Sequence, residues 1–106
     1  REAWDLIILD PPRMVTRRDG LEKGLRAYKD VNLLAIKLLR PGGILATFSC
    51  SGLVDMNQFR KTVGWAAHDS GRRVRILEML GQPPDHPVPL EAPECEYLKG
   101  LICVVD

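Results

Sequence analysis

The stretch WDLIILDPP, residues 4–12, decides the fold that we expect for this chain. Its four consecutive aliphatic residues are typical of a strand that is buried on both faces, as in a parallel sheet covered by helices. The two prolines end the strand, because proline cannot donate to a β-ladder. A buried strand needs other segments to cover it, so we expect the chain to be a piece of a longer protein.

Helix and strand patterns alternate through the rest of the chain. They predict a helix over about residues 21–40, ended by Pro41-Gly42-Gly43, and then a strand over 43–49. A second helix, capped by Asp55 and Gln58, should end near Gly71. A strand over 72–80 with Val74, Ile76 and Leu80 on one face, a proline-rich loop over 81–96 and a strand over 97–105 complete the chain. Strand–helix–strand connections of this length form parallel crossovers, whereas the last two strands, which have no helix between them, should pair antiparallel. The predicted fold class is α/β, the C-terminal half of a doubly wound sheet in the order β-α-β-α-β-β, with the last strand antiparallel at one end of the sheet.

Composition sets the limits on function. The 106 residues suffice for one modest domain, and 15 basic against 14 acidic side chains give no general attraction to nucleic acid. Three cysteines without a C-x-x-C pair argue against a disulfide framework and against a metal site, which favours a reducing, cytoplasmic setting. No apolar run approaches the ~20 residues that cross a bilayer, so we expect no membrane partner.

Ligands of open parallel sheets bind beyond the carboxyl ends of the strands. The first predicted strand ends at Asp10-Pro11-Pro12 and the second ends just before Cys50. A thiolate can add to carbon 6 of a pyrimidine ring and make carbon 5 nucleophilic, while a nearby carboxyl group hydrogen-bonds the ring. We therefore predict Cys50 and Asp10 as catalytic residues, with the carbonyl of Pro12 free to accept a hydrogen bond from an exocyclic amine. The alternatives are an inert buried thiol and an aspartate that only caps a turn.

Two further groups are candidate substrate contacts. Arg13, Arg17 and Arg18 lie in the loop that leaves the first strand and could bind phosphates, although a solvated basic surface is nearly as good an interpretation. Asp85 and His86 lie in the proline-rich loop, which we expect to overhang the same edge of the sheet.

Other conspicuous side chains are assigned to structure. Arg72, Arg73 and Arg75 begin the third strand at the edge away from the site, so we interpret them as ordinary surface. Tyr28 and Trp65 have helical spacing, and we predict them in the core and not as platforms for stacked bases.

Several motifs together resemble one family. Residues 5–12 (DLIILDPP) resemble motif IV of class I S-adenosylmethionine-dependent methyltransferases, and residues 39–45 (LRPGGIL) resemble the junction before their fifth strand. Residues 47–51 (TFSCS) resemble motif VI of RNA cytosine-5 methyltransferases, in which the cysteine is the nucleophile. With residues 81–87 (GQPPDHP) and 97–101 (YLKGL), they resemble the large-subunit ribosomal RNA cytosine-5 methyltransferases that carry an N-terminal PUA domain.

The resemblance covers essentially all 106 residues. It implies a ribosomal RNA substrate, S-adenosylmethionine as methyl donor, a covalent adduct on Cys50, and contacts of Asp10 and Pro11 with the cofactor. The glycine-rich cofactor motif is absent, and by analogy it would precede Arg1, as would a PUA domain. Residues 1–106 would then be the C-terminal part of a single methyltransferase domain, which we expect to be inactive alone.

One departure from the family concerns product release. Many RNA cytosine-5 methyltransferases carry a second cysteine after the motif IV proline, where this chain has Pro12 and Arg13. The base that releases the product is therefore not identified; Asp85 and His86 are candidates by position only.

Two other functions stay open. Methyltransferases that modify exocyclic or amide nitrogens have an aromatic residue after Asp/Asn-Pro-Pro, where this chain has Arg13, and they would leave Cys50 without a role. A non-catalytic nucleic-acid-binding or assembly module is the second alternative. Whatever its function, we expect the isolated chain to self-associate through exposed apolar surface.

Overall fold

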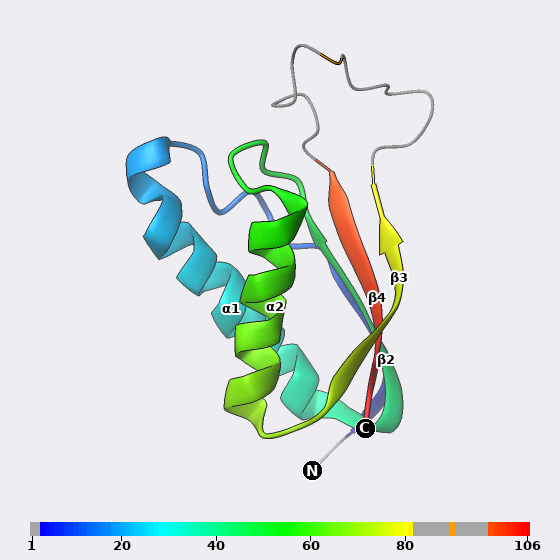
Figure 1. The fold of residues 1–106 in the computed structure, drawn as a ribbon. Helices are drawn as coiled ribbons and strands as arrows, with labels where there is room; N and C mark the ends of the chain where they lie inside the picture. The colour runs from blue at the N-terminus through cyan, green and yellow to red at the C-terminus, as the bar shows by residue number, and fades with distance from the viewer. Residues whose placement is uncertain (1–2, 82–89, 91–97) are drawn as a thin grey trace.

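The computed structural model describes residues 3–81, 90 and 98–106. The elements, coloured from blue to red along the chain in Figure 1, are β1 (Trp4–Leu9), a 3-10 turn η1 (Arg18–Gly20), α1 (Leu21–Leu38), β2 (Leu39–Ser49), α2 (Met56–Ser70), β3 (Val74–Leu80) and β4 (Lys99–Val105). This is the predicted order of strands and helices.

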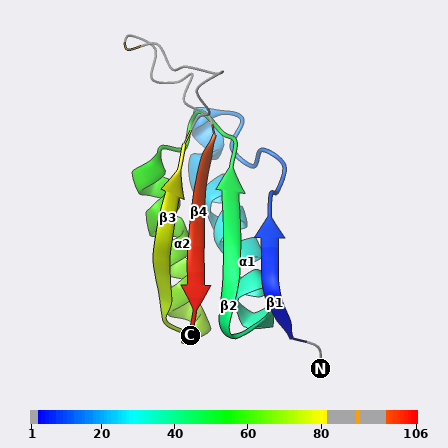
Figure 2. The ribbon, with the colours of Figure 1, turned by 90° about the vertical axis from the view of Figure 1, so that its right-hand side faces the viewer.

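The four strands form one sheet in the order β1-β2-β4-β3. β1 and β2 are parallel, and β4 is antiparallel to both of its neighbours, as Figure 2 shows with β4 pointing against the other three strands. The mixed α/β class and the antiparallel last strand are therefore confirmed. The predicted place of that strand was wrong: β4 lies between β2 and β3 and not at one end of the sheet.

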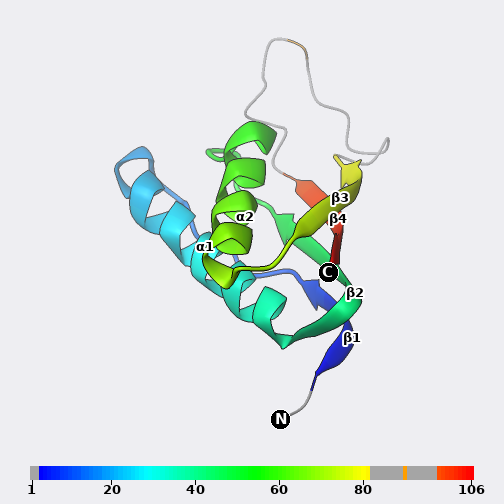
Figure 3. The ribbon, with the colours of Figure 1, turned by 60° about the horizontal axis from the view of Figure 1, so that its bottom comes forward.

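Both helices lie on the same face of the sheet, behind it in Figure 2 and seen from another side in Figure 3. The core lies between these two layers. At its centre the rings of Tyr28 and Phe59 meet edge to face with centroids 6.2 Å apart, and both side chains are fully buried. Edge-to-face packing of this kind stabilises an aromatic pair beyond its burial alone.

A buried polar chain joins α1 to β2 across this core. The hydroxyl of Thr47 donates a hydrogen bond of 2.6 Å to Oδ1 of Asn32, whose amide donates one of 2.7 Å to the carbonyl of Tyr28. Thr47 and Asn32 are both fully buried. Because buried polar groups are costly without partners, this chain fixes how α1 sits on the sheet.

The opposite face of the sheet is not covered by either helix. Leu6 and Ile8 of β1 are 54% and 68% exposed there, and by register they share that face with the partly exposed Ile44 of β2 and Val104 of β4. The first strand is therefore covered on one face only in the described part of the chain, whereas its sequence is typical of a strand covered on both.

The predicted boundary between the first helix and the second strand was wrong by a few residues. α1 ends at Leu38, and β2 begins at once at Leu39. The pairing then jumps from Trp4 opposite Leu39 to Leu6 opposite Ile44, and Gly42 has a φ of 84°. Residues 41–43 thus form a bulge in the strand, a conformation that needs the positive φ of glycine.

A second bulge explains another error. The pairing of β3 with β4 shifts between Ile76 and Glu78, so that Ile76 lies opposite Cys103 but Leu80 lies opposite Gly100. A single inserted residue moves every later side chain to the other face. Ile76 and Leu80 therefore do not share a face, contrary to the prediction.

Arg72 has a structural role that the sequence did not suggest. Its guanidinium donates to the carbonyls of Ile36 and Leu39 at the end of α1, and its Nε donates 3.2 Å to the carbonyl of Asp106. The last carbonyls of a helix lack partners within the helix, and a cation there also complements the helix dipole. Arg72 is thus not ordinary surface, whereas Arg73 and Arg75 are exposed as predicted.

The ends of α2 match the predicted signals. Asp55 and Gln58 form a reciprocal capping box, and Gly71 ends the helix with a φ of 72°.

Trp65, which we predicted in the core, is 41% exposed, and the ammonium of Lys29 lies 4.8 Å from the centre of its ring. The same ammonium is 2.7 Å from Asp69, and this hydrogen bond holds the pKa of Asp69 below its ordinary value.

The Thr47–Asn32 contact gives a stability prediction. Thr47→Val keeps the shape of the side chain but leaves Oδ1 of Asn32 buried without its donor, so we expect the free energy of unfolding in urea to fall by about 1–3 kcal/mol. Thr62→Val is the matched control, because the hydroxyl of Thr62 is also buried but donates 2.7 Å to the carbonyl of Gln58 within its own helix. Its loss should be smaller; equal losses would show that the Thr47–Asn32 contact contributes nothing specific.

Candidate functional site

Asp10 and Cys50 lie at the same edge of the sheet. Asp10 follows Leu9, the last residue of β1, and Cys50 follows Ser49, the last residue of β2. Because the two strands are parallel neighbours, both residues follow carboxyl ends, at the upper edge of the sheet in Figure 2. This is the edge at which open α/β sheets bind ligands.

The two residues are staggered and not directly opposite each other. Leu9 pairs with Thr47, so β2 runs two residues further than β1. With a rise of about 3.3 Å per residue and about 4.8 Å between strands, the Cα atoms of Asp10 and Cys50 are roughly 8 Å apart. Their side chains can therefore approach a bound molecule from two sides.

Accessibility separates the two cysteines that the structure describes. Cys50 is partly exposed, whereas Cys103 of β4 is fully buried. Burial raises the pKa of the Cys103 thiol to about 11, which leaves it protonated and unreactive at neutral pH. Of these two cysteines, only Cys50 is accessible to a substrate.

Ser51, the residue after Cys50, is fully buried and anchors the segment that follows β2. Its hydroxyl donates 2.6 Å to the carbonyl of Val15, in the segment that follows β1. Its own carbonyl accepts hydrogen bonds from the backbone N–H of Val54, at 3.3 Å, and from Nζ of Lys99, at 2.8 Å. These contacts hold the backbone beside Cys50.

Lys99 is the residue at this edge that the sequence analysis missed. It is 1% exposed and begins β4 directly opposite Ser49. Lysine is almost never fully buried unless its charge has partners, so the residue type alone predicts an exposed side chain. The next residue, Gly100, is tightly packed, since a Cβ there would come within 2.6 Å of the Phe48 ring, but this contact is visible only in the structure.

The remaining predicted residues of the first loop are accessible. Asp10, Pro12, Arg13, Arg17 and Arg18 are exposed, and Pro11 is partly buried. Arg17 and Lys23 help to line a hollow of about 340 Å³ between this loop and the start of α1. Nε of Arg17 is also 3.6 Å from Oδ1 of Asp19, an exposed ion pair of little energetic weight.

Asp85 and His86 lie outside the described residues. Within the described ranges, no three acidic, histidine or cysteine side chains come together as a metal site. Neither helix described here is long and apolar enough to cross a membrane.

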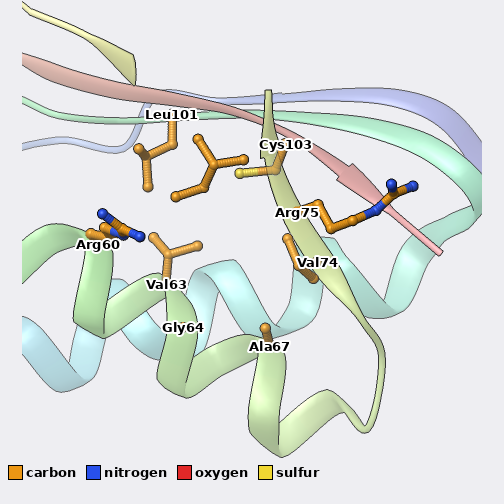
Figure 4. A pocket seen from close by; sticks show the side chains of 9 residues that line it. Arg60, Val63, Gly64, Ala67, Val74, Arg75, Leu101 and Cys103 are labelled. Atoms are coloured by element: carbon orange, nitrogen blue, oxygen red, sulfur yellow. The ribbon is translucent and has the colours of Figure 1, made fainter. Parts of the chain in front are cut away.

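A separate cavity of about 460 Å³ lies between α2 and the strands β3 and β4. Figure 4 shows Val63, Leu101 and Cys103 directed into it and Arg75 pointing away. None of the predicted site residues lines it. It is a gap between the helical layer and the edge of the sheet, distinct from the edge that carries Asp10 and Cys50.

Solved structures define the class of fold. One is SMU.776, described as a methyltransferase complexed with SAH, and the other is described as a SAM-dependent methyltransferase from Streptococcus mutans. Each matches 97% of this chain and 26% of its own chain, with a TM-score of 0.79 and 19% sequence identity. The chain therefore has the fold of part of a methyltransferase.

Curated relatives are more specific, although no family model matches the chain. The chain is 56% identical over 104 residues to the ribosomal RNA large subunit methyltransferase I of Pseudoalteromonas atlantica and 51% identical over 104 residues to the protein of that name from Cronobacter sakazakii. Each alignment covers 98% of this chain but 26% of the relative. The chain thus spans about a quarter of the length of the relatives it matches.

Proposed function

We propose that the protein containing this chain transfers a methyl group from S-adenosylmethionine to ribosomal RNA. The observation that carries the proposal is the similarity of nearly the whole chain, at 56% and 51% identity, to two ribosomal RNA large subunit methyltransferases. The methyltransferase fold agrees with it. A ribosomal RNA substrate and an accessible free thiol at Cys50 also fit a cytoplasmic setting.

Within that activity we propose that the target atom is carbon 5 of a cytosine and that Cys50 is the nucleophile. The thiol of Cys50 would give its proton to a base, and its sulfur would bond to carbon 6 as the carbon 5–carbon 6 π bond breaks. Carbon 5 would then take the methyl group, and the donor would leave as the demethylated thioether. Loss of the carbon 5 proton to a base then breaks the sulfur–carbon bond. The partial exposure of Cys50 at the carboxyl end of β2 supports this role.

Asp10 and the prolines after it would orient the two reactants. Asp10 is exposed, and ideal strand spacings put its Cα atom roughly 8 Å from that of Cys50, so its carboxylate could hydrogen-bond the ring while the sulfur attacks. Pro12 is exposed and follows the end of β1, so its carbonyl could accept a hydrogen bond from the exocyclic amine of cytosine.

S-adenosylmethionine supplies an activated methyl group when it is bound. Asp10 and Pro11 are the residues of this chain that would contact it, and their place at the carboxyl end of β1 fits a ligand of an open sheet. We propose that the rest of the cofactor site, and a PUA domain, belong to the portion of the protein outside this chain. Residues 1–106 would then be the C-terminal part of one methyltransferase domain.

The nitrogen-methylating alternative has less support. It requires an aromatic residue after the Asp10-Pro11-Pro12 sequence, and Arg13 is there. It also gives no role to Cys50. A non-catalytic module would have no need of an accessible thiol and carboxylate at the ligand-binding edge.

Covalent trapping tests the proposed chemistry. RNA with 5-fluorocytosine at the target should form a denaturation-resistant adduct with the full-length wild-type protein, because fluorine cannot leave as a proton does. Cys50→Ala should form none, whereas Cys103→Ala should behave as the wild type, since Cys103 is fully buried. Equal adduct from wild type and Cys50→Ala would contradict the cysteine mechanism, and an N-methylated product would favour the alternative.

The basic loop gives a prediction about salt. If Arg13, Arg17 and Arg18 contact three phosphates, their combined replacement by alanine should weaken RNA binding and lower the slope of log affinity against log salt by about 2–3. Arg73→Ala, an exposed arginine at the opposite end of the sheet, is the control. A slope unchanged in the triple variant would show that the loop is only solvated surface.

The uncovered face of the sheet predicts self-association. We propose that the isolated 106-residue chain pairs with itself through the face that carries Leu6 and Ile8, because these apolar side chains are 54% and 68% exposed. Light scattering should show a mass above 11.9 kDa that falls toward it in the double variant Leu6→Lys/Ile8→Lys. A monomeric wild-type chain at high concentration would refute this.

A further inference from the structure

We propose that Lys99 is a positioning residue for the nucleophile Cys50, an inference that rests on the proposed function. Its ammonium donates a 2.8 Å hydrogen bond to the carbonyl of Ser51, the residue that directly follows Cys50. The bond spans 48 residues of sequence and joins the start of β4 to the end of β2. The position of the Cys50 backbone therefore depends on this side chain.

Lys99 is almost completely buried. Only 1% of the residue is exposed, and removing an ammonium from water is costly unless it is hydrogen-bonded, so its contact with the Ser51 carbonyl lies in a tightly packed part of the structure. A charged donor makes a stronger hydrogen bond to the Ser51 carbonyl than a neutral donor would, so it fixes the residue after Cys50 more firmly.

The geometry around Ser51 shows what the ammonium adds. The Ser51 hydroxyl holds the segment from one side through the carbonyl of Val15, at 2.6 Å. Lys99, which lies directly opposite Ser49 on the neighbouring strand β4, holds this segment from the other side. With both contacts the residue after Cys50 is fixed in two directions, and a reacting sulfur gains most from such fixed placement because small displacements lower rates strongly.

Three variants of the full-length protein test the proposal. Lys99→Met removes the charge and the donor while keeping a similar length, and Lys99→Arg retains both. Lys29→Met is the matched control, because it removes another ammonium whose side chain is only 12% exposed, bonded to Asp69 between the two helices and not at the site. Circular dichroism melting confirms that each variant is folded at the assay temperature.

The first readout does not depend on RNA. Iodoacetamide at pH 7.5 is followed by mass spectrometry of the peptide that contains Cys50, with the buried Cys103 as a slow internal reference. We expect Lys99→Met to slow alkylation of Cys50 about tenfold, because the segment that carries the sulfur loses one of its two anchors, and Lys99→Arg to restore the rate to within about threefold. Lys29→Met should react within about twofold of the wild type.

The second readout is the rate of adduct formation with 5-fluorocytosine RNA. Lys99→Met should lower the maximal rate at least about tenfold while the RNA concentration for half-maximal rate stays within about twofold, because the side chain acts on the sulfur and not on RNA binding. If the wild type forms no adduct, the proposed function fails, and the alkylation rates alone decide the role of Lys99.

Two outcomes would overturn the proposal. One is wild-type alkylation of Cys50 in Lys99→Met. The other is an equal loss of maximal rate and RNA affinity in Lys99→Met that Lys99→Arg does not restore, which would make Lys99 a structural residue only. If Lys99→Met does not fold, Lys99→Gln replaces it, because glutamine keeps a donor without the charge; slow alkylation supports the proposal and a wild-type rate refutes it.

Discussion

The buried hydroxyl of Ser51 donates a 2.6 Å hydrogen bond to the carbonyl of Val15, and this contact joins the segments that follow the two parallel strands. Each segment carries one half of the candidate site. Val15 is 1% exposed, so the bond lies where water cannot replace it. The register of β1 and β2 sets how far apart Asp10 and Cys50 lie, and this bond ties together the two segments that continue beyond them.

Much of this arrangement could be predicted from sequence because its signals are local. The aliphatic run ended by Pro11 and Pro12 identifies β1, and the pair of Asp55 and Gln58 marks the start of α2. The parallel pairing of β1 and β2 follows from the helix between them. Together these predict Asp10 and Cys50 at one edge.

The features that could not be predicted all depend on distant parts of the chain. Sequence patterns do not show which strands β4 pairs with, so they could not place it between β2 and β3. The bulge between Ile76 and Glu78 has no local marker, yet it reverses the faces of the residues beyond it. Lys99 would be predicted on the surface from its residue type, because its partner, the Ser51 carbonyl, is 48 residues away in the sequence. The prediction for Trp65 was wrong because helical spacing alone does not tell a buried side chain from one that is 41% exposed with the Lys29 ammonium 4.8 Å from the centre of its ring.

The stagger between the strand ends bears on the kind of chemistry that the edge can perform. A carboxylate and a thiol that act on each other, as base and nucleophile, must lie within hydrogen-bond reach. The register of Leu9 with Thr47 instead separates the Cα atoms of Asp10 and Cys50 by roughly 8 Å. The two residues are therefore better placed to act on different parts of a substrate than to activate one another, while the Lys99 ammonium anchors the backbone of the residue beside Cys50.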